Sequence, residues 1–116
     1  MDIYHIWFNL KPGVRDTAFT DALAGYMDHL ESQGLVETRR LMRRKLGLAP
    51  PGLGEFHLMI ETRDMAQLEA AFAKVASRTE PAEGAHHGVN RLVAGVSFGL
   101  YRDFPDTGRE YGQERF

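Results

Sequence analysis

The sequence predicts an α+β domain, in which a four-stranded antiparallel sheet carries its helices on one face. Two observations lead to this fold class. The period of the hydrophobic pattern switches repeatedly between two and 3.6 residues, in the order β-α-β-β-α-β. Right-handed crossovers in such a chain then place the first and third strands side by side and antiparallel in the centre of the sheet.

The first strand is expected over residues 3–10, where side chains alternate between two faces. One face is wholly apolar or aromatic, and the other carries His5, Trp7 and Asn9. A helix follows after the break at residues 11–13, because apolar side chains recur at helical spacing from Phe19 to Leu30. We expect Asp16 to be its N-cap and Gly34 to end it in a left-handed conformation.

The second and third strands are expected over residues 35–46 and 55–62, with the proline-rich loop 47–54 between them. The third strand repeats the two-faced pattern of the first. Phe56, Leu58 and Ile60 share one face, and the other holds Glu55, His57, Met59 and Glu61.

The second half of the chain repeats the order of helix and strand. A helix is expected to begin at Asp64, where Gln67 completes a capping-box pattern. A further short helix over residues 85–94, stopped by Gly95, and a strand over 96–102 complete the order. We therefore expect one domain over residues 1–104 and a polar tail over residues 105–116.

Composition excludes several classes of protein. The 116 residues contain 43% hydrophobic and 26% charged side chains, which is ordinary for a soluble globular domain. The net charge of −2 argues against nucleic acid as a partner, and the apolar runs are too short to cross a membrane. There are no cysteines, so thiol chemistry and disulfides are excluded, and a cytoplasmic location is expected.

The second face of the two central strands has no element of the predicted fold to cover it. His5, Trp7 and Asn9 share this face with His57 and Met59. An exposed apolar patch of this kind marks an interaction site. The simplest cover is a second copy of the chain, so we expect a homodimer.

With this element order, the chain resembles the dimeric α/β-barrel superfamily of ferredoxin-like folds over residues 2–104. It is also similar to a small group of uncharacterised bacterial members through residues 1–9 (MDIYHIWFN) and 50–57 (PPGLGEFH). The resemblance implies two sheets packed face to face, with a cavity on each open face. Members of the superfamily include cofactor-free monooxygenases, lactone isomerases, haem-degrading enzymes and stress-related proteins, so the fold narrows the function only weakly.

The leading candidates for chemistry are His5 and His57, which neighbouring strands bring to the same face. A histidine in a partly closed cavity can transfer protons near neutral pH. In this interpretation Asn9 donates a hydrogen bond to a developing oxyanion, and Trp7 and Met59 form an apolar wall. The alternative is that these side chains only fill the interface between two copies.

Four further residues are candidates for the same site. His86 is a candidate acid or base, because it lies at helical spacing from Asn90 in the short helix. Arg40 and Arg44 fall on one side of the second strand and could hold an anionic group of a substrate, although basic residues also protect edge strands. Glu55 shares the face of His57 at the start of the third strand and is a candidate for binding the substrate.

Two other interpretations stay open. A metal site would combine His5 or His57 with Glu55, Glu61 or His86, but no compact spacing such as H-x-x-x-H is present. A haem site would use the His, Trp and Asn of the first strand, in an arrangement that differs from that of the haem-degrading enzymes. We expect neither a metal nor a cofactor.

The function expected from the sequence is that of a homodimer binding a small organic molecule in a pocket on the open sheet face. Its chemistry would be cofactor-independent oxygenation or isomerisation with histidine as the acid or base. The alternative is a non-catalytic dimer, stress-related or structural.

Overall fold

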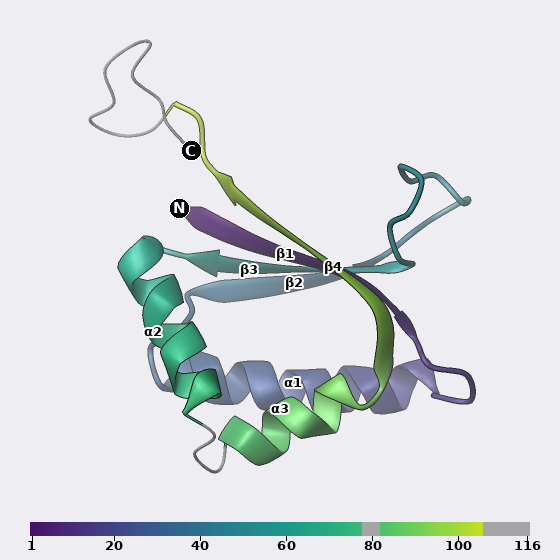
Figure 1. Cartoon of the computed structure of the whole chain (residues 1–116), viewed down its shortest axis with the longest axis horizontal. Coiled ribbons are helices and arrows are strands. Elements are labelled where there is room, and N and C mark those ends of the chain that lie inside the picture. The colour runs from purple at the N-terminus through teal and green to yellow at the C-terminus, as the bar shows by residue number, and fades with distance from the viewer. Residues whose placement is uncertain (78–81, 106–116) are drawn as a thin grey trace.

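The computed structural model describes residues 1–77 and 82–105. Four strands form one antiparallel sheet in the order β2-β3-β1-β4, and the three helices described all lie against one face of it (Figure 1). The elements are β1 (Asp2–Leu10), α1 (Asp16–Ser32), β2 (Thr38–Arg43), β3 (Phe56–Thr62), α2 (Met65–Ala76), α3 (Ala82–Asn90) and β4 (Val93–Arg102). The expected topology, with β1 and β3 antiparallel in the centre, is confirmed.

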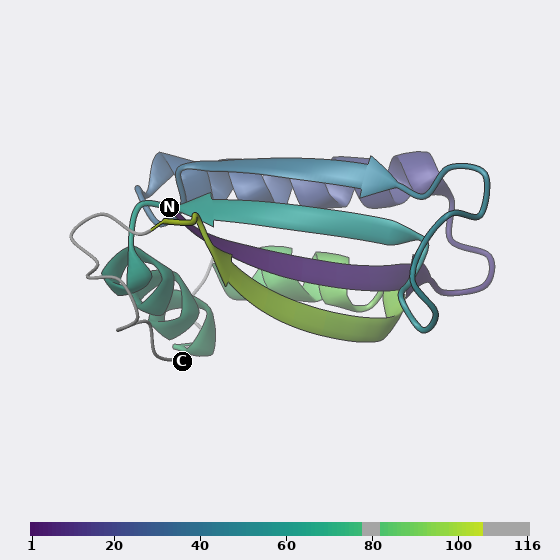
Figure 2. The ribbon, with the colours of Figure 1, turned by 90° about the horizontal axis from the view of Figure 1, so that it is seen from above.

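The pairing of β1 decides which side chains share a face. Against β3, His5 pairs with Met59 and Trp7 pairs with His57. Against β4, His5 pairs with Gly99, and the register shifts between Trp7 and Asn9. Since neighbouring strands keep their alternation in register, the odd-numbered residues of β1 and β3 lie on the face away from the helices. Figure 2 shows this open face, over which no helix of the described residues passes.

The core lies between the other face of the sheet and the helices. Phe19 and Met27 of α1 are fully buried, and Phe8 of β1 packs with Phe19 and Phe56 at ring-centroid distances of 5.2 and 5.7 Å. Leu68 is the most buried apolar side chain of α2. Helix α1 therefore buries the apolar stripe that its 3.6-residue period predicts, whereas α2 buries Leu68 and Ala71 and leaves Phe72 exposed.

Two of the expected helix boundaries are confirmed. Asp64 caps α2, since its Oδ1 accepts a hydrogen bond from the backbone N–H of Gln67 at 2.9 Å. The Gln67 side chain returns a hydrogen bond to the residue before the cap, as its Oε1 accepts from the backbone N–H of Arg63 at 2.7 Å, which resembles the reciprocal bond of a capping box. Gly34 follows α1 at a φ of 70°, and its N–H donates to the carbonyl of Glu31.

Two other boundaries are wrong. Asp16 is the first residue of α1 and not its N-cap, which is Arg15 in an extended conformation. Asp16 still favours the helix there, because a carboxylate in the first turn interacts with the helix dipole. Gly95 does not stop a helix, since α3 ends at Asn90 and Gly95 lies inside β4 at a φ of 62°. Glycine here allows the irregularity at which β4 shifts register against β1.

The expected second strand is longer than the observed one. Thr38–Arg43 forms β2, whereas residues 44–55 make a long connection to β3 that extends beyond the sheet (Figure 1). Among the described residues, three ion pairs attach this edge strand to α1: Arg39 contacts Asp28 at 2.6 Å and Glu31 at 3.1 Å, and Arg43 contacts Asp16 at 3.3 Å. The expected polar tail, residues 105–116, falls outside the described residues from position 106 onward.

Gly54 is the residue at which the β2–β3 connection comes close to the backbone of β1. A Cβ atom at this position would lie only 2.4 Å from the backbone carbonyl of Phe8, and the glycine is buried. Asn9 supports the same contact, because its Oδ1 accepts a hydrogen bond from the backbone N–H of Glu55 at 2.9 Å. The connection can therefore approach β1 only where a side chain is missing.

We predict that Gly54→Ala lowers the free energy of unfolding by about 3 kcal/mol, since the backbone of Phe8 must shift to admit the methyl group. The matched control is Gly25→Ala in α1, where an added Cβ meets nothing within 4 Å. This control should raise stability by about 0.5–1 kcal/mol. Urea unfolding measures both, and equal stability of the two variants would contradict the contact.

Candidate functional site

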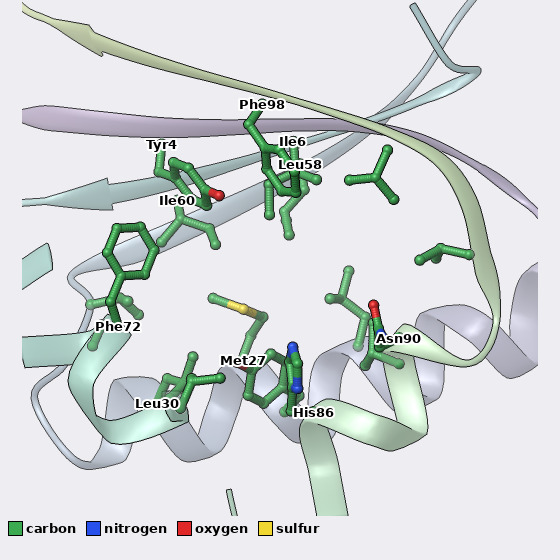
Figure 3. Close-up of a pocket in the computed structure, with 18 of the residues that line it drawn as sticks. Tyr4, Ile6, Met27, Leu30, Leu58, Ile60, Phe72, His86, Asn90 and Phe98 are labelled. Carbon is green, nitrogen blue, oxygen red and sulfur yellow. The ribbon is translucent and has the colours of Figure 1, made fainter. Parts of the chain in front are cut away.

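A cavity lies between the helix-covered face of the sheet and the helices. Its volume is about 410 Å³, within the range of small-molecule sites. Figure 3 shows Ile6, Leu58 and Ile60 projecting into it from the sheet, opposite Met27 and Leu30 of α1. The sequence analysis expected a pocket on the open face of the sheet. This cavity lies instead on the opposite, helix-covered face.

Four side chains bring polar atoms to this apolar cavity. Tyr4 comes from β1, Tyr26 from α1, and His86 and Asn90 from α3. Burial raises the pKa of Tyr26 to about 12 and also raises the pKa of Tyr4, so both phenols are neutral donors at physiological pH. The ring of His86 lies 5.7 Å from that of Tyr26 between centroids. Asp, Glu, Lys and Arg are absent from the described residues lining the cavity.

Aromatic rings border the cavity between β1, β4 and α2. Tyr4 contacts Phe72 edge to face, with centroids 5.2 Å apart, and lies parallel to Phe98 at 5.9 Å. Phe72 is 46% exposed and Phe98 is 63% exposed, although both line the cavity. The cavity is therefore open to solvent beside these two rings.

The open face carries a cluster of aromatic and imidazole rings. Nδ1 of His5 and Nε2 of His57 are 2.8 Å apart, which is the distance of a hydrogen bond from one ring to the other. Trp7 stacks on His57 at a centroid distance of 4.5 Å, and Tyr101 contacts His5 edge-on at 4.9 Å. Burial lowers the pKa of both histidines, and the neighbouring His5 lowers that of His57 further.

A smaller hollow of about 230 Å³ lies on the open face beside this cluster. Four of the residues expected at a site there line it: Trp7, Arg44, Glu55 and His57. The connection 44–55 forms its outer wall through Leu48, Pro50 and Leu53. The structure thus brings part of the expected residue set together, around a hollow about half the size of the main cavity.

The remaining expected residues are dispersed. Arg40 and Met59 pair across β2 and β3 on the open face, away from the hollow. Asn9 holds the backbone of Glu55 through its carbonyl oxygen. Of the expected acid–base residues, only His86 lines the main cavity, on the opposite side of the sheet from His5 and His57.

Sequence reasoning missed Tyr26 as a cavity residue. Tyr26 belongs to the apolar stripe of α1 and is indistinguishable there from a core residue by spacing alone. The signal that was available is its hydroxyl group, because a tyrosine in an otherwise apolar stripe needs a polar partner or access to solvent.

Comparisons with known proteins identify the fold. A family model described as "Family of unknown function (DUF6614)" matches residues 1–116. No curated protein matches the sequence significantly.

Similar solved structures include a variant of SnoaB, a cofactor-independent oxygenase from Streptomyces nogalater, at a TM-score of 0.68 and 11% identity, covering 93% of this chain and 97% of that one. An Arabidopsis thaliana protein has a TM-score of 0.70 and 10% identity, over 89% and 95% of the two chains. A dimeric ferredoxin-like protein of unknown function from Jannaschia sp. has a TM-score of 0.60 and 13% identity, over 89% and 100%. At these identities the likeness shows the fold alone, and that fold is the expected ferredoxin-like one.

In the described part of the chain, no helix is both long and apolar enough to cross a bilayer.

We predict that Tyr26 ionises near pH 12, and that stability falls as the pH rises from about 10. The folded protein holds the phenolic proton more tightly than the unfolded chain does. The contribution of Tyr26 to the free energy of unfolding is therefore complete below pH 10 and is lost as the pH rises from about 10 to about 12. Absorbance at 295 nm follows the ionisation, and circular dichroism confirms that the protein remains folded. Tyr26→Phe should remove the late step; a folded protein in which all four tyrosines ionise near pH 10 would contradict the burial.

Proposed function

The chain belongs to the DUF6614 family, a family of unknown function, and we propose that it is a homodimeric protein that binds a neutral, ring-containing organic molecule between its sheet and helices. The observation that carries this proposal is the cavity of about 410 Å³ among the core residues. Protein interiors are close-packed, and their voids seldom exceed the size of a water molecule. A cavity of this size in a small domain supports the proposal of a binding site.

The lining indicates the chemistry of the ligand. A charged ligand would lose its hydration and gain no ion pair, because the described lining contains no Asp, Glu, Lys or Arg. The parallel rings of Tyr4 and Phe98, with Phe72 edge-on, favour a flat aromatic ligand. The hydroxyl, imidazole and amide groups at the cavity fit one or two hydroxyl or carbonyl groups on an otherwise apolar molecule.

His86 is the residue that we propose as the acid or base. A neutral imidazole on the cavity wall can accept a proton from an acidic O–H or C–H group of the ligand and become an imidazolium ion. Returning that proton to another atom of the same molecule completes an isomerisation without any oxidant. With dioxygen as co-reactant, the deprotonated ligand could instead be oxidised from CH₂ to C=O, with release of one water.

The homodimer is the second part of the proposal. The open face presents Trp7, Met42 and Met59 around the histidine pair, and its described part has no helix over it. Association of two such faces removes these apolar side chains from water. The similar structures described as dimeric ferredoxin-like proteins support this arrangement.

We predict that the neutral fluorescent probe N-phenyl-1-naphthylamine binds the cavity, and that Phe98→Glu raises its Kd by at least about tenfold, because the variant places a carboxylate in the apolar mouth. Phe98 is 63% exposed, so the substitution should leave the fold intact. Leu100→Glu is the matched control, since Leu100 is 50% exposed on the same face of β4 and does not line the cavity. Unchanged probe affinity in Phe98→Glu would contradict the proposed site.

A second prediction separates the dimer from the cavity. Met59→Glu should convert the protein from two chains to one, as measured by light scattering after size exclusion, because it places a charge on the open face. The same variant should still bind the probe. Phe98→Glu should behave in the opposite way, remaining dimeric while losing the probe. A monomeric wild type would overturn the dimer and leave the cavity proposal standing.

A further inference from the structure

The two histidines of the open face meet head-on. Their nitrogens are 2.8 Å apart, and their ring centroids are 5.1 Å apart. The centroid of an imidazole lies roughly 1.2 Å from each of its atoms, so the two nitrogens lie close to the line between the rings. The lone pair of one ring therefore points at the other nitrogen, with a single proton between them.

The surrounding structure fixes the positions of both rings. His5 and His57 project from the paired central strands β1 and β3, whose backbone register is continuous from Asp2 to Phe8. Trp7 stacks on both rings, at centroid distances of 5.5 Å from His5 and 4.5 Å from His57. Two side chains that are held on rigid strands lose little conformational freedom when both bind the same ion or molecule.

The protonation state also favours binding. Burial lowers the pKa of both imidazoles, so both are neutral at pH 7.5 and have a lone pair available. The other residues that alternation places on this face are Thr38, Arg40 and Met42 of β2, Met59 and Glu61 of β3, Ser97 and Tyr101 of β4, with Glu55 beside them. Arg40 lies across β3 from His5, and Arg43 and Arg44 line the adjoining hollow together with His57.

We propose that His5 and His57 together bind one divalent transition-metal ion of the kind that imidazole prefers, with Cu²⁺ bound most tightly and Zn²⁺ less tightly. Metal–nitrogen bonds of about 2.0–2.1 Å at a tetrahedral angle separate the two nitrogens by roughly 3.4 Å. The observed pair would need to open by about 0.6 Å, and each ring would turn by roughly 35° about its strand so that both lone pairs meet at the metal.

The site has two protein ligands in one chain. The described residues contain no group of three His, Cys, Asp or Glu side chains that could hold a metal ion. Water, an anion or the second copy would complete the coordination sphere. No sequence motif indicates the site, because the two ligands are 52 residues apart and only the β1–β3 register brings them together. The site lies on the opposite face of the sheet from the cavity, so it does not depend on the proposed ligand.

The chain contains a single tryptophan, Trp7, which stacks on the proposed site and reports on its occupancy. Cu²⁺ added to the full chain at pH 7.5 should quench Trp7 fluorescence with saturation at no more than one ion per chain, and excess Zn²⁺ should restore part of the signal. His5→Gln and His57→Gln should each weaken Cu²⁺ binding by at least about tenfold, because each removes one of two linked ligands. His29→Gln and His86→Gln are the matched controls and should bind like the wild type.

Several results would overturn the proposal. These are the absence of saturable quenching in the wild type, equal Cu²⁺ affinity in the His5 and His57 variants, and an equal loss in His86→Gln. If either variant unfolds, as judged by circular dichroism, the test rests on the wild type alone, through the quenching of Trp7 fluorescence and the ring signals of its histidines. Nuclear magnetic resonance should show Zn²⁺ shifting the ring signals of His5 and His57 but not those of His86; ring signals of His5 and His57 that do not move also overturn it.

Discussion

The pairing of β1 between β3 and β4 is the constraint on which the rest of the structure depends. Because its side chains alternate strictly, a single register assigns Tyr4, Ile6 and Phe8 to the helices and His5 and Trp7 to the opposite face. A slip of one residue would exchange the two sets. The close approach of Gly54 to the backbone of Phe8 and the hydrogen bond from Glu55 to Asn9 hold this register at one end of the sheet.

The two faces that result have different chemistry. The helix-covered face encloses an apolar cavity, with Tyr26 and His86 contributed by two different helices. The open face brings together two neutral imidazoles, which are joined by a hydrogen bond, and an indole that stacks on both of them. Since the sheet separates the cavity from this cluster, the proposed binding in the cavity can be altered by substitution independently of the proposed association through the open face. Metal binding by the histidine pair belongs to the open face and is separate from the cavity in the same way.

The sequence was sufficient for the fold and for placing His5 and His57 on the same face of neighbouring strands, because both follow from local periodicity and from the order of strands. Their contact depends on the β1–β3 register, which the sequence left open. It also predicted the capping of α2 by Asp64 and the end of α1 at Gly34. The main cavity could not be predicted in this way, since a cavity depends on how far the helices stand from the sheet. By their spacing, Tyr26 and Met27 are indistinguishable from ordinary core residues. The pocket was therefore expected on the open face. Gly95 misled because glycine suits both a helix end and an irregular strand.

The central claim is that a neutral ring compound occupies the space between sheet and helices. Its most direct test is the measurement of intermolecular nuclear Overhauser effects between such a compound and the isoleucine methyl groups of the protein. Ile6 and Ile60 line the cavity, whereas Ile3 lies on the open face. The account predicts contacts from the compound to Ile6 and Ile60 and none to Ile3. Contacts to Ile3 alone would place the ligand on the open face and contradict it.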